Sequence, residues 1–114
     1  MDIIRAWKRI GETPFQVITR VKKDYKITNI AACYTNRLDP MAQGVITILF
    51  GPSVHKAPCF NSCDKVYQFQ AILGVSTHSY DAMGRHTNYH EVQYEKALLF
   101  VEEMLKLNDT EYQQ

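Results

Sequence analysis

The chain has 114 residues, which is enough for one folded core and too few for two domains. Hydrophobic residues make up 46% of it and charged residues 22%, proportions that are ordinary for a soluble globular protein. No apolar run approaches the roughly 20 residues of a transmembrane helix, and the N-terminus lacks the apolar segment of a signal peptide. We therefore expect a single domain over residues 1–114 in a cytoplasmic protein without a membrane partner.

The net charge of +1 is distributed unevenly along the chain. Residues 1–56 contain nine Lys/Arg and four Asp/Glu, whereas residues 57–114 contain four and eight. A basic half can bind phosphates, although a charge run is more often a solvated helix face. The three cysteines, Cys33, Cys59 and Cys63, are odd in number, and the four histidines are scattered. We therefore expect reduced thiols and no metal site.

The first elements have clear boundaries. Residues 3–7 are short and apolar-rich, which predicts a strand. Thr13 and Pro14 suit the N-cap and first position of a helix. Apolar residues then recur at helical spacing, at Val17, Ile18 and Val21. We expect this helix to end near residues 24–25.

An acidic residue lies in a stiff loop before the next strong strand signal. Residues 30–36 are predicted as a short extended piece, and residues 45–50 form a β-branched run typical of a buried strand. Between them, Pro40 restricts both its own backbone and that of Asp39. Scaffolds commonly present catalytic groups in such loops, but this stretch alone favours the interpretation of Asp39 as a turn opener.

The second half is predicted as one strand, a loop and one helix. Residues 53–61 can hold a helical turn or two, interrupted at Pro58. Residues 65–73 alternate between apolar and polar side chains, which indicates a strand with one buried face. Residues 74–85 are predicted as a loop, residues 94–107 as a helix with one apolar stripe, and residues 109–114 as a frayed end. This mixture of elements indicates an α/β or α+β fold with helices packed on a sheet.

Three motifs in order resemble the TruB-type pseudouridine synthases, which isomerise a uridine in the T-loop of tRNA. They are Lys8-Arg-Ile-Gly-Glu-Thr-Pro14, Tyr34-Thr-Asn-Arg-Leu-Asp-Pro-Met-Ala-Gln-Gly44, and the segment from Asp64-Lys-Val-Tyr67 through Leu73–Thr77 to Tyr80-Asp-x-x-Gly84. The related RluA-type synthases share the Arg-Leu-Asp, but Pro40 and the first motif favour TruB. The resemblance extends over roughly residues 7–100 and implies a mixed, largely antiparallel sheet with packed helices.

The resemblance also implies roles for individual residues. Asp39 would be the catalytic carboxylate, acting as a nucleophile or stabilising charge at the sugar without a metal or cofactor. Tyr67 would stack on the target base, and Tyr34 stands where many members have a histidine that extrudes it. The remaining implied positions are Arg37, Lys65 and Lys8 for substrate binding or loop support, and Asp81 and Thr77 for bracing a loop. Each also suits an ordinary surface or structural role.

The resemblance implies a longer catalytic domain than these 114 residues. Family members continue through a Gln-x-Pro-Pro-x-Tyr-Ser-Ala segment to an arginine that pairs with the aspartate. Asn36 replaces a family glycine, and Arg9 replaces a proline. We therefore expect the N-terminal part of a pseudouridine synthase domain, completed by a further segment or a second chain. The alternative is a non-catalytic RNA-binding module that kept the loop.

Overall fold

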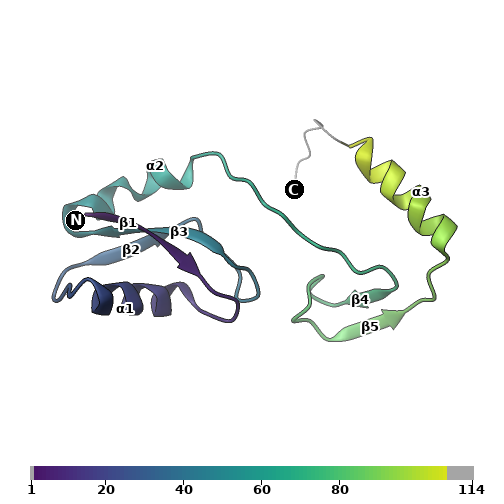
Figure 1. The fold of residues 1–114 in the computed structure, drawn as a ribbon, viewed down its shortest axis with the longest axis horizontal. Helices are drawn as coiled ribbons and strands as arrows, with labels where there is room; N and C mark the ends of the chain where they lie inside the picture. The colour runs from purple at the N-terminus through teal and green to yellow at the C-terminus, as the bar shows by residue number, and fades with distance from the viewer. Residues whose placement is uncertain (1, 108–114) are drawn as a thin grey trace. The chain divides into compact units, whose positions relative to one another are not determined.

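The computed structural model describes residues 2–107, which form an α+β protein in two compact units that divide between Tyr67 and Gln68 (Figure 1). The α+β class predicted from the sequence is confirmed. Within the described residues, no helix is both long and apolar enough to cross a bilayer.

A three-stranded antiparallel sheet forms the centre of the first unit. Its strands are β1 (Ile3–Lys8), β2 (Ala32–Thr35) and β3 (Gly44–Phe50), in the order β1-β3-β2. The central strand β3 is the most apolar, and its Ile46, Ile48 and Leu49 side chains are fully buried. All three strands were predicted from the sequence. The pair Lys8–Gly44 ends one ladder and Thr35–Thr47 ends the other, so both ladders end beside the loop that contains Asp39.

Helix α1 (Pro14–Asp24) covers one face of this sheet (Figure 1). The Thr13 hydroxyl accepts a hydrogen bond from the Gln16 amide, and the Gln16 side chain accepts one from the Thr13 amide. This reciprocal capping satisfies backbone donors that the first turn cannot pair internally. The three apolar side chains predicted to face the core are buried: Val17, Ile18 and Val21.

The segment after β3 is helical without the predicted interruption. A 3₁₀ helix, η1 (Gly51–Lys56), runs directly into α2 (Ala57–Asn61). Pro58 lies in the first turn of α2, where an amide N–H would have no intrahelical partner, so the proline is accommodated there. The expectation that Pro58 breaks the helix was therefore wrong.

The strand predicted over residues 65–73 is absent from the structure. Residues 64–72 have no regular hydrogen bonding, and Val66 and Ile72 are 99% and 81% exposed. A strand requires a neighbour for its N–H and C=O groups, and none of the described strands pairs with this segment. The alternating pattern suits a strand, but the described residues provide no partner strand for it.

The second unit contains a small hairpin and one helix. Strands β4 (Val75–Thr77) and β5 (His86–Tyr89) pair antiparallel, with an irregularity at Ser76/Thr77. The prediction of a continuous loop over 74–85 missed β4, because short polar strands give little alternating signal. Helix α3 (Tyr94–Leu105) confirms the predicted helix, although its apolar side chains are exposed. The prediction for residues 109–114 lies outside the described residues.

Candidate active-site loop

The loop from Asn36 to Gln43 connects β2 to β3 and contains the Arg-Leu-Asp-Pro sequence. Asn36 begins it with a φ of +60°, a left-handed conformation that asparagine tolerates better than most residues. The Asn36 amide donates a hydrogen bond to the Asn61 side-chain oxygen of α2, at 3.1 Å. The entry to the loop is therefore fixed by backbone geometry and by a contact from a helix distant in sequence.

Lys8, at the end of β1, holds the middle of the loop. Its side chain is fully buried, and its Nζ atom lies 3.0 Å from the Asp39 carbonyl oxygen, 3.3 Å from that of Pro40 and 2.7 Å from that of Ala42. The Arg9 carbonyl oxygen is a fourth acceptor, at 3.2 Å. An ammonium group has three N–H donors, and converging carbonyl dipoles compensate for its removal from water. Lys8 thus fixes the backbone that carries Asp39.

The turn after Lys8 adds backbone contacts to the same loop. The Gly11 amide donates a hydrogen bond to the Pro40 carbonyl at 2.7 Å, and the Ala42 amide donates one to the Asp39 carbonyl at 2.9 Å. Gly11 has a φ of +79°, which a glycine adopts without strain. The first two sequence motifs therefore meet directly in the folded chain.

The Asp39 side chain is exposed beside this rigid backbone, and so is Arg37. Among residues 2–107, ion pairs join Arg20 to Glu12 and Lys106 to Glu103, and neither includes Asp39. A carboxylate on a fixed backbone and open to solvent is accessible to a ligand.

A pocket of about 390 Å³ lies between this loop and the first turn of α1. Tyr34 of β2 and Arg37, Leu38 and Pro40 of the loop form one side, and residues 13–15 form the other. The rings of Phe15 and Tyr34 meet edge to face, with centroids 5.9 Å apart and planes at 81°. Phe15 was not predicted as a site residue. The sequence feature that could have identified it is an aromatic side chain outside the apolar stripe of α1.

An ion pair braces the approach to α1. The Arg20 Nε atom donates to Glu12 Oε1 at 3.0 Å, and a terminal guanidinium nitrogen of Arg20 donates to the Trp7 carbonyl at 2.8 Å. The hydrogen bond from Arg20 lowers the pKa of the Glu12 carboxyl and raises the pKa of the Arg20 guanidinium. This pair connects β1, the following turn and α1, the elements that present Lys8 and Phe15.

The other two predicted binding residues of the first unit lie beyond α2. Lys65 Nζ donates to the Asn61 carbonyl at 2.8 Å, and the Tyr67 side chain is 65% exposed. Neither residue lines the pocket beside Asp39. Tyr34 and Arg37 therefore line the pocket, and Lys8 binds the backbone of the adjoining loop that carries Asp39. Lys65 and Tyr67 do neither.

Thr77 and Asp81 belong to the second unit and support its β4–β5 loop. The Thr77 hydroxyl donates to the Asp81 carbonyl at 2.8 Å. The Asp81 carboxylate accepts from the Ser79 hydroxyl at 2.7 Å and from the Met83 amide at 3.0 Å. The Ser79 hydrogen bond is the main reason that the pKa of the Asp81 carboxyl lies below its usual value. These contacts are those of a side chain that shapes its own loop.

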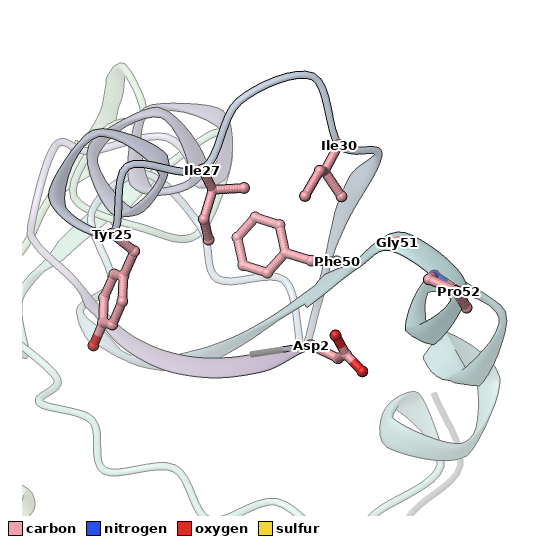
Figure 2. A pocket seen from close by; sticks show the side chains of 7 residues that line it. All are labelled: Asp2, Tyr25, Ile27, Ile30, Phe50, Gly51 and Pro52. Atoms are coloured by element: carbon pink, nitrogen blue, oxygen red, sulfur yellow. The ribbon is translucent and has the colours of Figure 1, made fainter.

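A second pocket, of about 330 Å³, lies at the opposite end of β3 and is mostly apolar (Figure 2). The Phe50 ring lies between Ile27 and Ile30, with Tyr25 and Asp2 farther out (Figure 2). None of the predicted site residues lines it. The candidate site is therefore the pocket beside Asp39.

The family described as "TruB family pseudouridylate synthase (N terminal domain)" matches residues 20–114 of the chain, a range that contains the Asp39 loop. The chain belongs to this family. Its similarity to a TruB-type synthase, first indicated by three motifs, is confirmed.

Relatives named tRNA pseudouridine synthase B match most of the chain. That of Clostridioides difficile is 37% identical over 82 residues, covering 72% of this chain and 27% of the relative. That of Clostridium novyi is 33% identical over 90 residues, covering 79% and 30%. That of Clostridium kluyveri is 33% identical over 103 residues, covering 90% and 35%. The chain thus spans about a third of the length of these relatives. No solved structure matches it.

Proposed function

We propose that this chain carries the catalytic-aspartate part of a TruB-like pseudouridine synthase that acts on a uridine in the T-loop of tRNA. The relatives are named for tRNA pseudouridine synthesis, which supports tRNA as the substrate class. In this proposal Asp39 is the catalytic residue, Tyr34 and Tyr67 contact bases, and Arg37 and Lys65 contact phosphates.

The reaction requires no net oxidation or reduction. The N1–C1′ bond of the uridine breaks, the base turns, and a C5–C1′ bond forms while C5 loses a proton and N1 gains one. A carboxylate next to the sugar can attack the reacting carbon or stabilise positive charge on the ring as the first bond breaks. Asp39 suits either role because its side chain is exposed while its backbone is held in place.

One observation carries this proposal, namely the set of hydrogen bonds from Lys8 to the carbonyls of Asp39, Pro40 and Ala42. A catalytic group must be held close to its productive position, and a surface turn has no such requirement. Burying a lysine ammonium costs free energy that its carbonyl acceptors must offset, and an ordinary surface turn forms without such a group. We infer that Lys8 is a positioning residue rather than a direct contact to RNA.

We further propose that residues 1–114 are one part of a catalytic domain that a further segment or a second chain completes. The chain spans only about a third of its relatives. Residues 66–73 and the apolar stripe of α3 are exposed, although their patterns are those of a strand and a helix that pack against other elements. A completing polypeptide would cover these surfaces and supply a cation for Asp39.

A non-catalytic RNA-binding module is the second candidate. It is favoured by the absence, among residues 2–107, of an ion-pair partner for Asp39, which leaves charge at the reaction centre without a counter-ion. This alternative predicts salt-sensitive binding of tRNA that is independent of the Asp39 carboxylate.

Tritium release from tRNA labelled at C5 of uridine distinguishes the two candidates. The chain is assayed alone and together with the remaining two-thirds of the Clostridioides difficile relative, expressed as a separate fragment. Release in either arm that is lost in Asp39→Asn and kept in Asp64→Asn, an exposed aspartate of the same unit, supports catalysis. Binding of tRNA without release in both arms contradicts catalysis and supports the second candidate.

A further inference from the structure

Phe15 is an exposed aromatic side chain at the pocket beside Asp39. It lies in the first turn of α1 and is 71% exposed, whereas the buried face of that helix is formed by Val17, Ile18 and Val21. Its exposed position means that folding of the first unit does not depend on burial of this ring. Phe15 therefore contributes mainly to the surface that it presents.

The contact between Phe15 and Tyr34 leaves an aromatic face available. In an edge-to-face pair, the edge of one ring points at one face of the other. At an interplanar angle of 81°, the contact covers a face of only one of the two rings, and Phe15 is the more exposed ring. The pocket volume of about 390 Å³ lies within the range of roughly 300–1,000 Å³ that is typical of small-ligand sites.

The charged side chain that lines the pocket is a cation, that of Arg37. The Glu12 carboxylate, just before the first turn of α1, is paired with Arg20. The remaining neighbouring acid is Asp39 itself. Aromatic faces beside arginine are the features by which proteins hold unstacked nucleic-acid bases.

We propose that this pocket binds a second unstacked RNA base, distinct from the reacting uridine, with Phe15 as its stacking surface and Arg37 beside the adjoining phosphate. The proposal rests on the function proposed above, because it assumes a single-stranded RNA loop at Asp39. It adds a substrate contact, Phe15, that lies on α1 outside the loop and could set which loop nucleotides are accepted.

Fluorescence anisotropy with a labelled tRNA T-arm hairpin tests this contact in the full 114-residue chain at fixed salt. We expect Phe15→Ala and Phe15→Leu to weaken binding about five- to hundredfold, the range measured for loss of one stacked base. Phe15→Tyr should retain affinity because it keeps an aromatic face. Phe69→Ala, which removes an exposed phenylalanine from the second unit, is the matched control and should bind like the original chain.

A hairpin whose loop is closed into continuous duplex separates stacking from general electrostatics. Phe15→Ala should bind this duplex as tightly as the original chain does. Equal hairpin affinity of Phe15→Ala and Phe69→Ala would overturn the base-stacking site while leaving the proposed function intact, and so would full affinity of Phe15→Leu. Failure to bind either RNA, both for the original chain alone and for the chain together with the completing fragment of the tritium assay, would instead overturn the proposed function and this inference with it.

Discussion

The Nζ atom of Lys8 lies 2.7 Å from the carbonyl oxygen of Ala42, although the two residues are far apart in sequence. This hydrogen bond and its neighbours join the end of β1 to the loop that carries Asp39. The loop is consequently supported from outside its own hairpin. The stability of the chain and the exchange of its loop amides should therefore depend on Lys8 and on the contacts around the loop.

Lys8→Met should destabilise the chain and loosen the loop. Methionine fills a similar volume but removes the ammonium donor. The Asp39 and Pro40 carbonyls then keep only their backbone N–H donors, and the Ala42 carbonyl loses the donor that Lys8 supplies. An acceptor left unsatisfied costs about 1–3 kcal/mol. Urea unfolding measures the stability, and hydrogen exchange at the Gly11 amide, which is bonded to the Pro40 carbonyl, reports on the loop. Lys23→Met, at an exposed position of α1, is the control. Equal behaviour of the two variants would contradict the role assigned to Lys8.

Glu12→Gln should lower stability at neutral pH by about 0.2–1 kcal/mol, the range for a partly exposed ion pair. The hydrogen bond from Arg20 holds the pKa of the folded-state carboxyl below its ordinary value of 4.5. The stabilisation is therefore present above the unfolded-state pKa and is lost as pH falls through the lower folded-state pKa. Urea unfolding between pH 7 and pH 3 should show the two proteins converging below about pH 4.5. A constant difference would refute the assignment.

Thr13→Ala should destabilise α1 by about 1 kcal/mol, since it removes the N-cap acceptor of the Gln16 amide. Thr13→Ser keeps the hydroxyl and should retain most of the stability. Far-ultraviolet circular dichroism during thermal unfolding measures both variants. A serine variant as unstable as the alanine variant would mean that the methyl group of Thr13, and not its hydroxyl, supports the helix.

Asn36→Gly should leave the chain as stable as it is or stabilise it. Glycine adopts the φ of +60° at this position without strain, and the substitution removes a buried side-chain oxygen that has no hydrogen-bond partner among the described residues. Asn36→Val should lose about 1–2 kcal/mol because a β-branched residue is strained in this region. Chemical denaturation ranks the three proteins. Greater stability of the valine variant than of the glycine variant would contradict the expected order.

The elements that could be predicted from the sequence are those whose signals are local. Thr13 and Pro14 mark a helix start by their own backbone preferences, and the β-branched run over 45–50 marks the central strand. The strand predicted over residues 65–73 was wrong. An alternating pattern shows that a segment can pair in a sheet, but it does not show whether a partner strand is present.

The candidate site was predictable only in part. Asp39, Tyr34 and Arg37 lie within one motif, so their proximity follows from adjacency in sequence. The contact from Lys8 to that loop depends on the register of β1 against β3, which no local pattern specifies. Phe15 reaches the pocket because α1 packs across the sheet, and that arrangement also depends on tertiary structure.

The Lys8 contacts also determine how the Asp39 loop can be engineered. Residues 36–43 form the connection of a hairpin whose stems, β2 and β3, already pair with each other, so the segment resembles a self-contained cassette. The segment is not self-contained, because the Lys8 ammonium group that binds its carbonyl oxygens belongs to β1. A graft of this loop onto another scaffold must therefore include an edge strand that ends in a lysine. Without that lysine, the backbone that carries the aspartate would not be held in position.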